Sequence, residues 1–275
     1  MIIMPVQRKV AAAGGAFTPA SLTDSVWLDG GDTATMWSDA SRATTIADGV
    51  GVQEWQAKGD NASLPVFLQA TSGARPVWEE TGGYVIFNGT SSYMTSLQSL
   101  FNDIGVLNLD GWSVYILARI RTSGTFRVII MELDEIDNDP DYSLIRTFTP
   151  GTTSQVYSRN DARTTVTSTE SSAFYVNNTL EVYGHVMDHT ASGGTGALDL
   201  YTQDDTTPDQ SKDFSPPALP SEVNRMVLGG FTHDWDTAVG SFADVDLYHL
   251  VAVPFAMGAT DRADLTSWLI SEGGL

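Results

Sequence analysis

The segment of this chain that best combines an aromatic side chain with carboxylates is the run 231–236, of sequence FTHDWD. The apolar C–H face of a sugar ring stacks on an indole, while the sugar hydroxyls form hydrogen bonds with neighbouring carboxylates. The candidate glycan-binding residues are therefore His233, Asp234, Trp235 and Asp236. The alternative is that Trp235 closes the end of a β-sandwich as a core residue.

A second candidate site is an acidic run that follows an apolar stretch. Asp137, Asp139 and Asp141 stand at alternate positions, a spacing that lets one loop wrap oxygen ligands around a hard cation such as calcium. The run is not an EF-hand loop, because Tyr142 stands where that loop has glycine and Thr149 where it has glutamate. We expect this run to be a solvated turn and the protein to have no cofactor, with calcium bound by these three aspartates as the alternative.

Glu132, Asp134 and Asp137 raise the question of hydrolysis. Their spacing is similar to the Glu-x-Asp-x-x-Glu strand of laminarinase-type glycoside hydrolases, in which the first residue is the nucleophile and the last the acid/base. A retaining pair must stand about 5 to 5.5 Å apart across the sugar bond, and aspartate at 137 is one methylene shorter than glutamate. We therefore expect no catalytic residues and no enzymatic activity, with a polysaccharide hydrolase as the weaker alternative.

Four segments frame the chain and share a family pattern. They are a Trp-Leu-Asp strand at 26–29 preceded by 17–22, a Trp-containing strand and an Ala-Thr segment closing on Arg-Pro at 52–76, an apolar strand with a polar turn and a return strand at 83–94, and a strand followed by a helix at 242–272. Together they resemble the concanavalin A-like (LamG-type) jelly-roll proteins often encoded among the structural genes of tailed bacteriophages. We interpret 83–94 as a β-hairpin. Between about residues 100 and 225 no motif matches.

The resemblance implies an all-β protein, a concanavalin A-like jelly-roll β-sandwich with a short C-terminal helix. Short apolar or alternating runs separated by Gly, Asp, Ser, Thr and Pro agree with this class. The predicted strands are 112–120, 126–133, 142–148, 155–159, 164–168, 180–187, 197–202, 226–229 and 245–253, with a long acidic loop at 202–220.

The alternation of residue types in the predicted strand 112–120 indicates how far each of its two faces is exposed to water. Its even-numbered residues from Trp112 to Ala118 share one face, and Ser113, Tyr115, Leu117 and Arg119 share the other. Because the second face carries leucine, we expect neither face to be fully exposed to water.

One helix is predicted, from about Thr260 to Glu272. Thr260 or Asp261 can cap its start, and the pair of glycines at 273–274 can end it. Leu265, Trp268 and Leu269 line one face at helical spacing, so we expect that face, including Trp268, to pack in the core.

Residues 1–16 read as an arm, and residues 17–275 as one jelly-roll domain. The arm has an apolar start, an adjacent basic pair and then small residues with two glycines, which make a flexible connection. Ile2, Ile3, Arg8 and Lys9 are the residues we expect to anchor it to a larger assembly. A frayed terminus is the alternative.

Charge and composition restrict the partners. The chain of 275 residues carries 34 acidic and 14 basic residues, for a formal charge of −20, so we expect no nucleic-acid partner. No run reaches the roughly 18 apolar residues of a membrane span, so we expect no membrane insertion. The absence of cysteine agrees with assembly in a reducing cytoplasm.

These features favour a bacteriophage virion structural protein, assembled in the host cytoplasm. We expect a decoration or fibre-associated jelly-roll module that is attached to capsid or tail proteins through its N-terminal arm and forms a homo-oligomer. A cell-surface glycan is a further expected partner, and a host glycan-binding adhesin is the alternative function. Fold resemblance alone does not select a ligand, because this architecture hosts lectins, enzymes and inert spacers alike.

Overall fold

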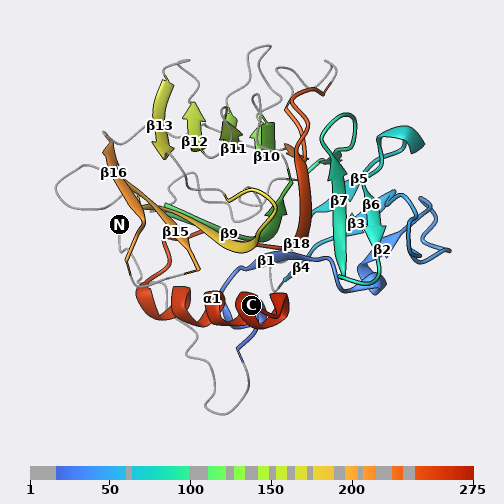
Figure 1. Cartoon of the computed structure of the whole chain (residues 1–275), viewed down its shortest axis with the longest axis horizontal. Helices are drawn as coiled ribbons and strands as arrows, with labels where there is room; N and C mark the ends of the chain where they lie inside the picture. The colour runs from blue at the N-terminus through green and yellow to red at the C-terminus, as the bar shows by residue number, and fades with distance from the viewer. Residues whose placement is uncertain are drawn as a thin grey trace, which may run out of the picture.

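The computed structural model describes residues 17–59, 64–98, 111–121, 127–133, 142–148, 153–159, 165–171, 176–188, 196–203, 207–214, 225–231 and 239–275. They form two antiparallel β-sheets and a C-terminal helix (Figure 1). Short 3-10 turns lie at η1 (Pro19–Ser21), η2 (Thr33–Thr35) and η3 (Ser72–Ala74). Within these ranges no helix is long and apolar enough to cross a membrane.

The first sheet is built around the long strands near its centre. In spatial order it consists of β16 (Gln210–Phe214), β15 (Gly196–Thr202), β14 (Leu180–Asp188), β9 (Gly111–Ile120), β18 (Asp244–Val253), β1 (Val26–Asp29) and β4 (Lys58–Gly59). Strand β18 pairs with β1 along its second half and with β7 (Tyr84–Asn88) along its first half, and β6 (Val77–Glu79) pairs with β7. Strand β18 therefore has three partners in the sheet, β9 on one side and β7 and β1 on the other.

The second sheet faces the first. In spatial order it consists of β13 (Thr165–Ser171), β12 (Thr153–Arg159), β11 (Tyr142–Phe148), β10 (Arg127–Leu133), β17 (Arg225–Leu228), β8 (Met94–Ser96), β5 (Val66–Leu68), β3 (Glu54–Gln56) and β2 (Met36–Trp37). The chain passes repeatedly between the sheets, which makes the molecule a jelly-roll β-sandwich. The predicted fold class is confirmed, and so are the strands predicted from 112 to 202, to within three residues at their ends.

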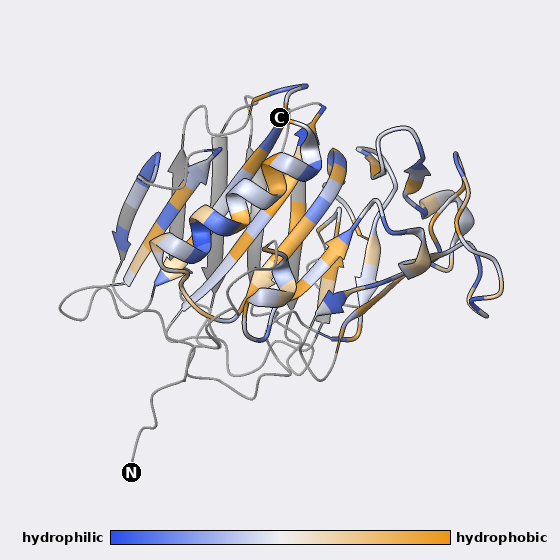
Figure 2. Cartoon of the chain, turned by 90° about the horizontal axis from the view of Figure 1, so that it is seen from below, coloured by the Kyte–Doolittle hydropathy of each residue, from blue (hydrophilic) through white to orange (hydrophobic). Residues whose placement is uncertain are grey.

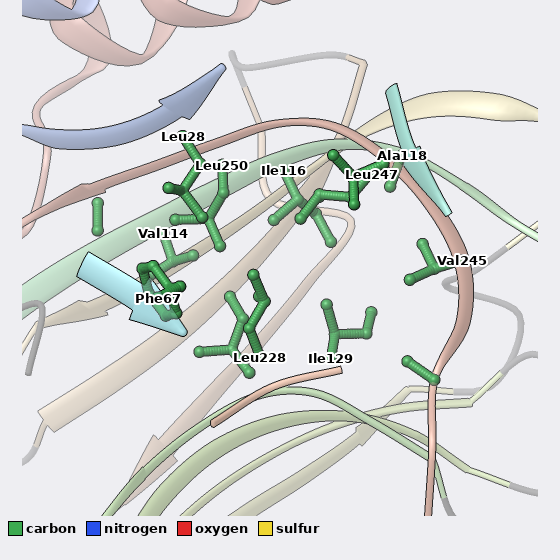
Figure 3. Packing of buried hydrophobic residues seen from close by; sticks show 14 of the residues in the cluster. Leu28, Phe67, Val114, Ile116, Ala118, Ile129, Leu228, Val245, Leu247 and Leu250 are labelled. Carbon is green, nitrogen blue, oxygen red and sulfur yellow. The ribbon is translucent and has the colours of Figure 1, made fainter. Parts of the chain in front are cut away.

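The main core lies between the two sheets (Figure 3). Val114 and Ile116 of β9 and Leu247 and Leu250 of β18 point into it from the first sheet, and Leu228 of β17 points into it from the second. Each of these side chains is at most 2 % exposed. Period-two alternation therefore directs one face of each long strand into the sandwich.

A second apolar layer covers the outer face of the first sheet. The helix α1 (Ala259–Gly273) lies across that face (Figure 2), and its Leu265 and Leu269 are fully buried against Tyr115 and Leu117 of β9 and Val251 of β18. The prediction that neither face of 112–120 is fully exposed to water is therefore confirmed. Trp268 packs at the margin of this layer and is half-buried.

The segment 83–94 is not a hairpin, and that prediction was wrong. β7 belongs to the first sheet and β8 to the second, so the intervening turn carries the chain across the sandwich. The side-chain oxygen Asn88 Oδ1 accepts hydrogen bonds from the backbone N–H groups of Thr90, Ser91 and Ser92, at 2.9, 2.9 and 3.1 Å. Asn88 thereby organises the crossing, which a strand–turn–strand pattern cannot distinguish from a hairpin.

Two further features differ from the predictions: a strand inside the predicted acidic loop and the first residue of the helix. The segment 202–220 contains β16, which pairs with β15 at the edge of the sheet, where polar residues are tolerated because one side of the strand is unpaired. The helix begins at Ala259 with Gly258 as its N-cap and no side-chain cap, rather than at Thr260 or Asp261. Its end at Gly274, in the left-handed conformation with φ of 63°, is as predicted.

Candidate functional site

The site residues predicted from sequence lie outside the described residues. This is true of the glycan candidates His233, Asp234, Trp235 and Asp236, the calcium candidates Asp137, Asp139 and Asp141, and the arm residues Ile2, Ile3, Arg8 and Lys9. Only the base of the glycan candidate loop is described. There the backbone N–H of Phe231 donates to Gly240 O at 2.8 Å, and Gly240 N–H donates to Phe231 O at 2.7 Å. These three sites stay predictions.

The hydrolase pattern is described only in part. Glu132 lies on β10, where its backbone stands opposite Ser143 of β11 and Met226 of β17. The strand ends at Leu133, and Asp134 and Asp137 lie outside the described ranges.

Over the part of the chain that the structure describes, no group of three or more histidine and carboxylate side chains is placed to hold a metal ion. His185 of β14 is fully buried, and burial lowers the pKa of its imidazole to about 3, so this side chain is neutral in the fold. It is a core histidine.

The structure does bring together a polar cluster on the outer face of the first sheet, beside the region that α1 covers. We call it the tyrosine–arginine cluster, and it consists of Glu79 (β6), Tyr84 (β7), Arg119 (β9), Arg121, Asp244, Asp246 and Tyr248 (β18). Residues far apart in sequence meet there because β6, β7, β18 and β9 are consecutive neighbours in the sheet (Figure 1).

Strand register places the charges. Asp246 pairs directly with Arg119 across β18 and β9, and on its other side β18 pairs with β7. Because alternate residues of β18 point to opposite faces, Val245 and Leu247 enter the core while Asp244 and Asp246 stay outside. The guanidinium of Arg119 and the carboxylate of Asp246 are thus held side by side on one face.

A β-bulge places the second tyrosine. The register between β18 and β9 shifts between Leu247 and His249, which leaves Tyr248 as the extra residue. Leu250 then returns to the core, so Tyr248 and His249 follow one another outside it. A bulge of this kind re-aims a side chain without ending the strand.

The two tyrosine rings form a tilted pair. The ring centroids of Tyr84 and Tyr248 lie 4.7 Å apart with an interplanar angle of 37°. The guanidinium carbon of Arg119 lies 5.5 Å from the Tyr84 ring centroid, and Arg119 Nη2 donates to the Tyr248 hydroxyl at 3.3 Å. Each of these three side chains is half-buried.

Ion pairs fix the arginines. Arg119 Nε donates to Asp246 Oδ2 at 2.9 Å, and Arg121 Nε lies 3.2 Å from both Asp244 Oδ1 and Asp246 Oδ1. Arg121 Nη2 also donates to the Phe87 carbonyl at 3.1 Å. The Asp246 side chain is 4 % exposed, whereas the side chains of Arg119 and Arg121 are 34 % and 33 % exposed. The carboxylate forms the base of the cluster and the guanidinium groups reach the surface.

Electrostatics keep the tyrosines protonated. Burial raises the pKa of both Tyr84 and Tyr248, the carboxylates of Asp246 and Glu79 act in the same direction, and Arg119 opposes them. Burial also raises the pKa of Asp246, although Arg121 and Arg119 act against that shift. Both hydroxyls are therefore able to donate hydrogen bonds at neutral pH.

Parts of this cluster were visible in the sequence but were not recognised as a site. Tyr84, Asp244, Asp246 and Tyr248 lie in the segments that carry the family resemblance, and Arg119 was predicted to share a strand face with Ser113, Tyr115 and Leu117. The alternation of polar residues along β18 was the one sequence signal that could have indicated this site. The sequence does not show the order of the strands in the sheet, and that order makes these residues neighbours.

Comparison with known proteins places this chain in no family. No protein-family model matches the sequence, and no curated protein matches it either. Among solved structures, the CBM40 module of the Ruminococcus gnavus IT-sialidase, solved with α2,3-sialyllactose, aligns at 11 % identity over 61 % of this chain and 86 % of that module, with a TM-score of 0.47.

Two further structures show similarly distant likenesses. The NanB sialidase of Streptococcus pneumoniae aligns at 11 % identity over 65 % of this chain and 26 % of its own, with a TM-score of 0.45. The binding domain of botulinum neurotoxin serotype G aligns at 12 % identity over 86 % of this chain and 50 % of that chain, with a TM-score of 0.46. Because all three scores lie below 0.5, we take neither a site nor a ligand from them.

Proposed function

We propose that this protein is a carbohydrate-binding β-sandwich module whose ligand site is the tyrosine–arginine cluster. The observation that carries the proposal is the tilted, half-buried pair of Tyr84 and Tyr248, with ring centroids 4.7 Å apart, beside the partly exposed guanidinium of Arg119. Aromatic faces beside convergent polar groups are the usual means by which proteins hold sugars.

Each component has a defined task in this proposal. The exposed part of the tyrosine pair receives the C–H face of one sugar ring. Arg119 donates one hydrogen bond to Asp246 and one to the Tyr248 hydroxyl. Its remaining N–H groups are presented to sugar oxygens. Glu79 accepts a hydrogen bond from Gly82 N–H at 2.8 Å and keeps further lone pairs for a hydroxyl.

The competing explanation is a purely structural cluster that ties β7 to β18. Both explanations predict some loss of stability when the cluster is cut, so stability cannot separate them. Ligand binding can, because Tyr84 lies near the surface of the cluster whereas Asp246 forms its buried base.

The test is a glycan array probed with wild type, Tyr84→Ala and a matched control, Tyr93→Ala. Tyr93 is also half-buried and also pairs with another ring, that of Phe242 at 6.1 Å, but it belongs to the turn before β8 and lies outside the cluster. We expect at least a tenfold loss of affinity for Tyr84→Ala and none for Tyr93→Ala, with both variants folded by circular dichroism.

A third variant, Trp235→Ala, tests the site predicted from sequence. Loss of binding in Trp235→Ala together with full binding in Tyr84→Ala would move the site to the 231–236 loop. A wild-type protein that binds no glycan on an array of host-surface polysaccharides would overturn the function itself.

A second proposal, favoured by the four sequence segments that resemble tailed-phage jelly-roll proteins, is that the module is carried on a virion. In it residues 1–16 attach the sandwich to capsid or tail proteins, and many weakly held copies remain bound through a symmetric lattice. Deletion of residues 1–15 should leave a folded protein that no longer joins the particle. Immunogold labelling of intact particles with antibody against 17–275 reports incorporation, and retention of the truncated protein would contradict the arm proposal.

The proposal includes no catalysis. A reducing-end assay on laminarin-like and host-surface glycans should give the same trace for wild type, Glu132→Gln and buffer. Release of sugar by wild type but not by Glu132→Gln would revive the hydrolase alternative.

A further inference from the structure

We infer that the tyrosine–arginine cluster selects neutral glycans and discriminates against those that carry carboxylate or sulfate groups. The inference rests on the proposed function and adds the chemical class of its ligand. Two guanidinium groups in a sugar site ordinarily indicate an acidic ligand. Whether that holds here depends on the groups that surround Arg119 and Arg121.

The first step concerns the charge of the two arginines. Arg119 is bonded to Asp246, and Arg121 lies 3.2 Å from a carboxylate oxygen of both Asp244 and Asp246. An acidic ligand has to compete with carboxylates that are already in place. Displacing Asp246 would leave a charge that is 4 % exposed without its partner, which is strongly unfavourable.

The second step concerns the local balance of charge. Within the cluster the carboxylates of Glu79, Asp244 and Asp246 outnumber the two guanidinium groups. The adjoining part of the same outer face adds Asp29 and Asp32, which share the single Lys58 at 2.9 and 3.0 Å. The local field, like the formal charge of −20 for the chain, repels an anion.

The third step concerns the hydrogen-bonding capacity that remains. The tyrosine hydroxyls, the unused guanidinium N–H groups and the Glu79 carboxylate offer both donors and acceptors. Sugar hydroxyls are themselves donors and acceptors and can satisfy this mixed set, whereas a carboxylate or sulfate only accepts and would face Glu79 without a proton to share. A neutral sugar therefore fits the cluster without displacing an internal ion pair.

The test uses the full chain on an array that prints each neutral oligosaccharide beside its sialylated and its sulfated form, in 50 and 500 mM NaCl. We expect at least tenfold stronger binding to the neutral member of a pair and less than a twofold change with salt, because no ion pair forms between protein and ligand. Stronger binding to the acidic members, weakened by salt, would overturn the inference while leaving the proposed function intact. An array on which nothing binds would contradict the proposed function instead.

Two variants sharpen the result. Asp246→Asn removes the one carboxylate charge that lies beside both guanidinium groups and should raise binding to acidic members by at least fivefold relative to their neutral partners. Because Asp246 is buried and this variant can lose its fold, Asp244→Asn, at a side chain 17 % exposed, provides a second route, since it removes one of the two carboxylates beside Arg121. Glu272→Gln is the control, since it removes one carboxylate from the exposed end of α1 and should leave the preference unchanged. An unchanged preference in folded Asp246→Asn and Asp244→Asn would also count against the inference.

Discussion

The imidazole of His249 meets the indole of Trp268 edge-on, with ring centroids 5.0 Å apart and an interplanar angle of 63°. His249 lies on β18, one residue after the bulge that presents Tyr248, and Trp268 lies on α1. The contact joins the helix to strand β18, which carries three of the seven residues of the tyrosine–arginine cluster. Protonation of His249 would therefore act on a contact that lies next to the candidate site along β18.

Acidification should destabilise the protein through His249. Burial lowers the pKa of this imidazole from 6.5 to about 4, although Asp29, whose Oδ1 lies 3.6 Å from Nδ1, acts in the opposite direction. The unfolded chain takes up the proton near pH 6.5 and the folded chain only near pH 4, so stability falls as pH falls through this window. At pH 5 this difference in pKa lowers the free energy of unfolding by about 2 kcal/mol relative to neutral pH, counting His249 alone.

Thermal melts between pH 7.5 and 4.5 check this expectation, with His249→Gln as the comparison. His185, whose pKa is lowered to about 3 by burial, adds a slope of the same sign that the variant keeps. The melting temperature of wild type should therefore drop more steeply than that of His249→Gln. Parallel curves for the two proteins would contradict the assignment to His249.

Gly229→Ala should be strongly destabilising. Gly229 follows β17 with φ of +83°, and a Cβ at this position would collide with the ring of Phe87 in the core. Its backbone N–H donates to Ile129 O at 2.8 Å and its carbonyl accepts from Ala243 N–H at 3.0 Å, so the backbone cannot move away. We expect a loss of about 3 kcal/mol from strain and overpacking together.

Urea unfolding measures this loss, and Gly73→Ala is the matched control. A Cβ at Gly73 meets nothing within 4 Å and the residue is not in the left-handed region. The control should lie within about 0.5 kcal/mol of wild type. Equal stabilities for the two variants would show that the close approach to Phe87 relaxes at little cost.

Asn88→Ala should weaken the crossing between the sheets. The variant removes the acceptor for three backbone N–H groups, which costs about 2 kcal/mol by analogy with the loss of a helix N-cap. Asn88→Asp keeps the acceptor and should retain most of the stability. Chemical denaturation of both variants separates the loss of the acceptor from a general sensitivity of the turn.

Leu269→Ala should show that α1 is part of the folded body. Leu269 is fully buried against the outer face of the first sheet, and its truncation should cost about 2 to 5 kcal/mol. Ser267→Ala, at an exposed position of the same helix, should have little effect. A loss below 1 kcal/mol for Leu269→Ala would mean that the helix is dispensable for the sandwich.

How far the sequence could predict the structure depends on the range of the interactions involved. Alternation and turn residues are local, so strands such as 142–148 and 180–188 and the helix before Gly274 were predictable. The turn at Asn88 was predicted as a hairpin because a strand, a polar turn and another strand look the same locally whether or not the two strands pair. Strand β16 was missed because an edge strand needs few apolar residues.

The sequence by itself determined the class of the protein: alternating apolar strands with Gly, Asp and Ser turns are typical of an all-β protein, the family resemblance indicates a jelly-roll sandwich, and the excess of carboxylates predicts an acidic surface. Only the tertiary structure decided which strands are neighbours and where the ladder of β18 slips by one residue. That slip turns Tyr248 out beside Tyr84, and the strand order brings Arg119 opposite Asp246. Both depend on pairing between residues about 130 to 160 positions apart, which no local pattern encodes.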